Sequence, residues 1–158
     1  MATTIEAADL TVTITEAVTL NGVNQGGTHT LTISNVVEAD RRIVEIGTTE
    51  LILLAFQATD PGAGTFDEAD VRYVRITNLD NENHVQLTFR DEDSTEFAVK
   101  LDAGKTFIWS CDNSGGVVDT MIAAGSALTV PSTFADLVDI TAIADTAACD
   151  VEYFVAGV

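Results

Sequence analysis

Residues 71–110 read VRYVRITNLD NENHVQLTFR DEDSTEFAVK LDAGKTFIWS, and this stretch decides the fold class. Val85, Leu87 and Phe89 alternate with polar residues, and the apolar positions of residues 96–102 alternate in the same way. A period of two is typical of a strand with one buried face, because successive side chains leave a strand on opposite sides. The connecting residues are rich in Asn, Asp and Gly, which favour tight turns. The stretch therefore predicts an antiparallel meander of four strands.

Similar patterns continue on both sides of this meander. Apolar residues alternate with threonines in residues 10–15 (LTVTIT) and 28–34 (THTLTIS). Further strands are expected at residues 41–46, 50–58, 137–144 and 149–156, with turns at residues 60–64 and 131–136. One helical turn is expected at residues 65–70, whereas residues 117–128 are too weakly patterned to place.

Together these segments predict an all-β fold in one domain spanning residues 1–158. About ten short strands separated by turn signals are typical of an antiparallel two-sheet β-sandwich, and we expect a jelly-roll-like arrangement with no long helix.

The charge of the chain restricts its partners. Its net charge is -18, from 25 acidic and 7 basic residues. Nucleic acid and anionic membranes are not expected partners, because phosphate groups are bound by Lys and Arg. All the basic residues lie between Arg41 and Lys105, so this part of the chain is expected to meet acidic neighbours.

Targeting signals and catalytic motifs are not found in the sequence. The longest apolar run, residues 51–56, is too short to cross a bilayer, and the N-terminal residues do not read as a secretory signal. Free thiols are therefore favoured over one bridge for Cys111 and Cys149. The cysteines, His29 and His84 do not have zinc-ligand spacing. Since no nucleophile, base or metal set is recognisable, neither an enzyme nor a cofactor is expected.

Two acidic loops offer candidate calcium ligands. Asp80 and Glu82 lie in one loop, and Asp91 and Asp93 lie in the next. Calcium prefers clustered oxygen ligands, but neither loop has the EF-hand pattern. Solvated turns are therefore the favoured interpretation of both loops.

Two groups of residues are candidates for an interface. Residues 51–56 (LILLAF) do not alternate, so this strand is either covered on both faces or meets another subunit through Leu51 and Leu53. Four arginines, which carry much of the scarce positive charge of the chain, form the second group and could pair with acidic neighbours. For each of them the alternative is ordinary ion pairing within the sheet. The members of this group are Arg41, Arg42, Arg72 and Arg75.

Residues 73–80 (YVRITNLD), 100–108 (KLDAGKTFI) and 149–157 (CDVEYFVAG) resemble segments of small virion structural proteins of tailed bacteriophages, especially head decoration or cement proteins. The resemblance implies a non-enzymatic β-sandwich that forms a symmetric homo-oligomer and binds the major capsid protein or another virion protein. It also implies a place in the virion, after assembly in the host cytoplasm, and makes residues 1–9 the candidate for an arm that reaches a neighbour.

A tail or fibre-associated module that binds a receptor or carbohydrate is the alternative function. Such a module would need exposed aromatic residues at its loop tips. Trp109, Tyr73 and Tyr153 all fall within expected strands, which counts against this alternative.

Overall fold

The computed structural model describes residues 5–57, 65–112, 114–121 and 134–158. These residues form thirteen strands and one short 3-10 helix, η1 (Val117–Thr120). The strands are β1 (Ala8–Thr15), β2 (Thr19–Leu20), β3 (Val23–Asn24), β4 (Thr28–Val36), β5 (Glu38–Ile46), β6 (Leu51–Gln57), β7 (Thr65–Asp67), β8 (Val71–Asn78), β9 (Val85–Asp91), β10 (Glu96–Leu101), β11 (Thr106–Ser110), β12 (Leu137–Ala144) and β13 (Cys149–Gly157).

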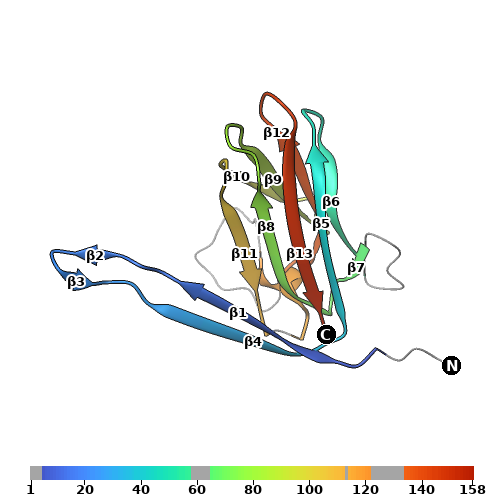
Figure 1. The fold of residues 1–158 in the computed structure, drawn as a ribbon. Coiled ribbons are helices and arrows are strands. Elements are labelled where there is room, and N and C mark those ends of the chain that lie inside the picture. The colour runs from blue at the N-terminus through green and yellow to red at the C-terminus, as the bar shows by residue number, and fades with distance from the viewer. Residues whose placement is uncertain (1–4, 58–64, 113, 122–133) are drawn as a thin grey trace.

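The body of the protein is a sandwich of two sheets (Figure 1). One sheet has the order β11-β8-β13-β5, and the other has the order β10-β9-β12-β6-β7. Without β7, the order is that of a jelly roll. The first strand of the sandwich, β5, pairs with the last, β13, and its second strand, β6, pairs with β12. The predicted all-β jelly-roll sandwich is therefore confirmed.

The inner faces of the two sheets form one hydrophobic core. Phe89 lies at its centre with 1% of its surface exposed, and its ring stacks on Phe97 with the centroids 4.7 Å apart. Phe107 and Trp109 approach the same ring from the opposite sheet, at centroid distances of 5.3 and 6.1 Å. Side chains that the alternation places on one face of β9, β10 and β11 thus meet in the core.

The predicted meander is wrong in its pairing, although its four strands exist. β9 pairs with β10, but β8 pairs with β11 and β13 and lies in the opposite sheet from β9. The connections from β8 to β9 and from β10 to β11 therefore cross between the sheets. Alternation shows that one face of a strand is buried, but it does not identify the neighbouring strand.

Two local predictions also differ from the structure. Within the helical turn expected at residues 65–70, residues 65–67 are instead strand β7, which pairs in parallel with β6 and places Phe66 in the core with 2% exposure, and residues 68–70 form a turn. Burial of this aromatic ring outweighs the local capping pattern. Within residues 117–128, Val117 and Val118 begin η1 and are fully buried. The remainder from residue 122, the turn at 60–64 and residues 131–133 lie outside the described residues.

Candidate assembly surface

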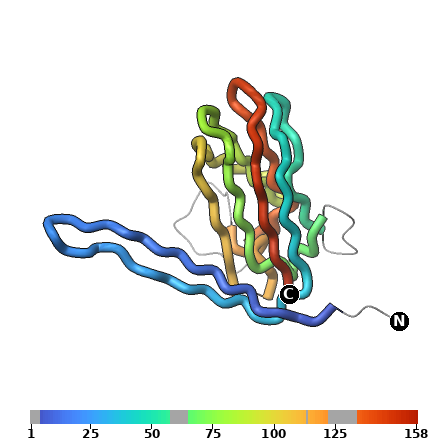
Figure 2. The backbone as a smooth tube through the Cα atoms, in the orientation of Figure 1, coloured from blue at the N-terminus to red at the C-terminus, as the bar shows by residue number. Residues whose placement is uncertain are grey.

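A long β-hairpin leaves the body and extends into solvent (Figure 2). It consists of β1 and β4, continued by the short pair β2 and β3, and we call residues 8–36 the arm. Its tip is Asn21-Gly22, with φ angles of 50° and 79°. Positive φ at both central residues is the mark of a type I′ turn, whose twist matches that of the flanking strands. The local sequence Leu-Asn-Gly-Val therefore closes the hairpin.

The arm has two chemically different faces because its register stays constant from residue 10 to residue 33. Leu10 pairs with Ile33 near the base, and Leu20 pairs with Val23 at the tip, so alternate residues share one face between these positions. The largely apolar face comprises Leu10, Val12, Ile14, Val18, Leu20, Val23, His29, Leu31 and Ile33, and it also carries Glu16 and Gln25. The opposite face of β1 and β4 carries three cross-strand threonine pairs, Thr11–Thr32, Thr13–Thr30 and Thr15–Thr28.

The base of the arm is fixed to the body by a second, small hydrophobic cluster. Ile33, Tyr73 and Ala156 are its buried members, with exposures of 4%, 3% and 1%. Leu10 and Phe154 pack against them. The apolar face of the arm thus lies on the outer face of the sheet β11-β8-β13-β5, which orients the hairpin relative to the body.

The distal half of the arm leaves its apolar side chains in solvent. Ile14, Val18, Leu20 and Val23 are 39%, 44%, 59% and 56% exposed. Glu16 is the only charged residue in residues 10–37 of a chain that carries 25 acidic side chains. Depletion of charge is typical of the centre of a protein interface, and an isolated two-stranded ribbon is only marginally stable in water. These properties make the arm the candidate assembly surface.

The sequence did not single out this element as the arm. Of the candidate residues 1–9, residues 1–4 lie outside the described part of the chain, and Ala8 and Asp9 already belong to β1. The signals that could have found the hairpin are the Asn21-Gly22 turn and the long stretch with one charge. The strand pattern alone does not show that this hairpin remains outside the sandwich.

The four candidate arginines all have partners within the chain. Arg41 and Arg75 both bind the carboxylate of Glu152, which is 6% exposed, and the Arg75 Nη2 to Oε1 distance is 2.6 Å. These two guanidinium groups hold the pKa of Glu152 below its usual value. Arg42 pairs with Asp40 at 2.9 Å. Arg72 donates a hydrogen bond to the carbonyl oxygen of Ala69 at 2.5 Å.

Leu51 and Leu53 belong to the core rather than to an exposed face. Leu53 is 7% exposed, the next residue Leu54 is fully buried, and Leu51 packs against the same cluster. A register shift in the pairing of β12 with β6 interrupts the alternation at this point. The exposed apolar side chain of this strand is Ile52, at 59%.

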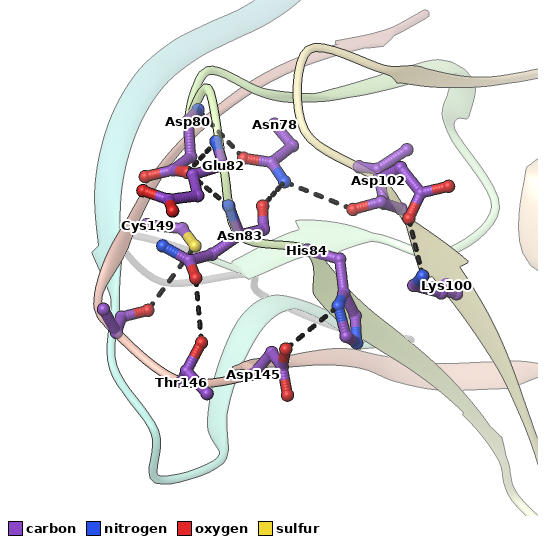
Figure 3. A network of polar contacts seen from close by, with 12 residues as sticks. Asn78, Asp80, Glu82, Asn83, His84, Lys100, Asp102, Asp145, Thr146 and Cys149 are labelled. Atoms are coloured by element: carbon purple, nitrogen blue, oxygen red, sulfur yellow. Dashed lines mark hydrogen bonds and ion pairs between the residues drawn. The ribbon is translucent and has the colours of Figure 1, made fainter.

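A polar network connects loops at one end of the sandwich (Figure 3). The Asp80 carboxylate accepts hydrogen bonds from the backbone amides of Glu82 and Asn83 at 2.7 and 2.6 Å, which lowers the pKa of Asp80. The buried Asn78 amide donates to the carbonyl oxygens of Asn83 and Leu101. These contacts shape the turn after β8, so the oxygen of Asp80 that the sequence offered to calcium already has a structural role.

The second acidic loop is similar. Asp91 is 8% exposed, and its Oδ1 accepts a hydrogen bond from the Thr95 amide at 2.7 Å. It lies at the opposite end of β9 from Asp80, so the structure does not bring the two pairs of candidate ligands together. Within the described residues, no group of three or more His, Cys, Asp or Glu side chains is arranged to hold a metal ion.

The histidines and cysteines are separated by their surroundings. Cys149 is a buried free thiol, and burial together with nearby carboxylates raises its pKa, so it is a poor nucleophile. Cys111 forms no disulfide with Cys149. His84 Nδ1 lies 3.3 Å from Asp145, whereas His29 lies on the arm. Within the described part of the chain, these groups form no catalytic triad of thiol, imidazole and carboxylate.

None of the protein family models, curated proteins or solved structures compared with this chain matches it. Among the described residues, no helix has the length and apolar character needed to cross a bilayer. The arm and the body that carries it are therefore the features that indicate a function.

A carboxylate cluster on the body makes the stability of the protein depend on pH. Glu68, Glu92, Asp119 and Asp136 line one surface hollow. Burial is the main cause that raises the pKa of Glu68 and of Asp136, and repulsion from neighbouring carboxylates adds to it. At neutral pH the folded state thus keeps these carboxylates charged and close together, whereas in the unfolded chain they can move apart.

We expect the thermal midpoint to rise as the pH is lowered from 7 towards about 5, because the folded cluster binds protons before the unfolded chain does. The gain should end near the ordinary Glu value of 4.5. Below it, stability should fall as the pH passes through the lowered pKa of Glu152. Thermal unfolding at several pH values measures this, and Glu68→Gln should reduce the rise. A midpoint that falls steadily from pH 7 would contradict the prediction.

Proposed function

We propose that this protein is a non-enzymatic capsid decoration or cement protein, which self-associates and binds subunits of a virion. The observation that carries the proposal is the projecting arm, whose residues 10–37 contain one charged side chain. A surface of this kind favours contact with another protein over solvent. The phage context comes from the resemblance of residues 73–80, 100–108 and 149–157 to proteins of that class.

The division of charge between body and arm supports this role. The body carries almost all of the acidic residues, which keeps separate particles soluble and repels nucleic acid. Residues 10–36 of the arm can approach another protein without desolvating more than one charge, and attachment through Ile33 and Tyr73 holds the arm in a defined direction. In this proposal the jelly roll is a rigid platform and the arm is the binding element. The major capsid protein or another virion protein is the partner.

The alternative function, a receptor- or carbohydrate-binding module of a tail or fibre, receives less support. Tyr73 and Tyr153 are each 3% exposed, and Trp109 lies against Phe89 in the core with its indole N–H bonded to Thr120. The exposed large hydrophobic side chains of the described residues are aliphatic. Sugar sites depend on exposed aromatic rings, which this surface does not present in the described residues.

A shortened arm tests the proposal. In this variant a two-residue Asn-Gly turn replaces residues 15–28. The turn connects Ile14 to its cross-strand partner His29 and keeps the base of the hairpin intact. The wild-type protein is expected to bind capsids assembled from the major capsid protein of the same genome, in saturable cosedimentation. The shortened arm should lose at least about tenfold in affinity, a change of about 1.4 kcal/mol.

Thermal unfolding provides the control, because the core does not include residues 15–28 and the shortened protein should unfold near the wild-type midpoint. Equal binding of the wild-type and shortened proteins would contradict the role of the arm. Failure of the wild-type protein to bind any virion subunit would contradict the function itself.

A further inference from the structure

The outer edge of β1 borders a groove on the body. The groove is lined by five consecutive arm residues, 10–14, and by Tyr73, Arg75, Ile108 and Phe154 of the body. Ile108 is 40% exposed and forms part of its floor. Because both odd and even residues of β1 line the groove, the groove runs along the edge of the strand.

This edge of β1 has unpaired backbone groups. In the described structure β1 pairs only with β4. The hydrogen bonds Glu16 N to Gly27 O and Gln25 N to Val18 O set the alternation, since bonded pairs occur at every second residue of an antiparallel ladder. Continued toward the base, this alternation turns the amide and carbonyl groups of Thr11 and Thr13 outward. They form a template for another strand.

Residues 10–15 of β1 also lack the features that usually protect an edge strand. Edges are commonly blocked by charged residues or proline. The edge strand β5 carries Glu38, Asp40, Arg41, Arg42 and Glu45 in its nine residues. By contrast, residues 10–15 of β1 contain only threonine and aliphatic residues. The difference indicates that the edge of β1 is an interface, whereas the edge of β5 is protected from pairing.

The best-fitting occupant is the arm of a second copy. Two copies with a charge of -18 repel each other, so their contact is favoured where acidic side chains are few, and residues 10–15 of β1 carry none. If two β1 strands pair antiparallel about a two-fold axis, the apolar faces of both arms point to the same side. Each tip, with Leu20 and Val23, then extends toward the other body, beside Ile108 and Phe154.

The arm is long enough to supply one side of a dimer interface. A standard interface uses about 20–30 residues on each side. The arm spans residues 8–36, and the groove floor adds further residues from β8, β11 and β13. A two-fold axis doubles every contact, because each copy contributes both an arm and a groove.

We propose that the protein forms a two-fold dimer in which β1 of one copy pairs with β1 of the other, and in which each arm lies in the groove of its partner. The result is a four-stranded ribbon, β4-β1-β1-β4, that buries the exposed apolar face of both arms. This inference deepens the proposed function, because it names the second copy and the surface through which the protein self-associates.

Proline substitutions on the two edges of the arm test the pairing. Thr13→Pro removes an amide on the outer edge of β1, whereas Thr30→Pro removes one on the outer edge of β4, and the two residues are cross-strand partners. In sedimentation at about 100 μM, the wild-type protein and Thr30→Pro should be dimeric, and Thr13→Pro should weaken the dimer at least about tenfold. Thermal unfolding of both variants checks that the body remains folded.

A second pair of variants tests the groove. Ile108→Lys should weaken the dimer, and Ile52→Lys, at a comparably exposed position on the other sheet, should not. A photo-crosslinking residue at position 20 should link to residues 8–15 or 106–110 of an isotopically distinct copy. A monomeric wild-type protein, equal effects of the two prolines, or crosslinks elsewhere would overturn the inference. The capsid cosedimentation assay is separate, so a monomer that still binds capsids would contradict self-association and leave the proposed capsid binding standing.

Discussion

Phe89→Ala is expected to lower the free energy of unfolding by about 4 kcal/mol, because it removes the ring that joins the two sheets. Phe89 is 1% exposed and contacts aromatic rings from both sheets, with the Phe97 ring stacked at 4.7 Å. Urea unfolding followed by tryptophan fluorescence measures the change.

Ile52→Ala is the matched control for this substitution. Ile52 is a large apolar residue in the same sheet, but it is 59% exposed. Its replacement should change the free energy of unfolding by about 0.5 kcal/mol. Similar losses for the two variants would show that Phe89 is not the centre of the core.

Gly116→Ala is expected to destabilise the fold by at least about 3 kcal/mol, through strain and a direct clash. Gly116 has a φ angle of 73°, and a Cβ atom at this position would lie 2.1 Å from the carbonyl oxygen of Glu68. The next two residues, Val117 and Val118, are fully buried. The backbone therefore cannot move away without withdrawing both valines from the core.

Gly104→Ala separates the two causes. Gly104 has a similar φ angle of 67°, but a Cβ atom there would meet nothing within 4 Å. Its substitution should cost only the conformational strain, about 1 kcal/mol. Thermal unfolding of both variants measures the difference, and equal losses would show that the contact with Glu68 is unimportant.

The proposed function assigns different physical tasks to the two parts of the molecule. The body is stabilised by its own core, so it should fold without a partner. The arm is a two-stranded ribbon with exposed Leu20 and Val23, and such a ribbon gains most of its stability from a partner. Assembly and arm order are thus expected to be coupled, and a partner that binds the groove of the folded body should also stabilise the body by mass action.

The sequence determined the strands and which of their faces are buried. Val85, Leu87 and Phe89 alternate with polar residues, and all three are buried, because the two-residue period of a strand fixes which side chains share a face. The same pattern predicted the all-β class. The Asn21-Gly22 turn needs only local backbone preferences. The overall charge, which counts against nucleic acid as a partner, is likewise a property of composition.

Only the tertiary structure decided how those strands pair and which surface is left over. β8 and β9 follow each other in the chain yet lie in opposite sheets, because strand pairing depends on contacts between distant segments such as β5 and β13. Arg41 and Arg75, two of the arginines that the sequence offered to a partner, bind Glu152, because β13 lies between β5 and β8 and brings this carboxylate to both side chains. The arm became the candidate site because the two sheets of the sandwich are complete without it. No local sequence pattern shows that the sandwich leaves the arm out.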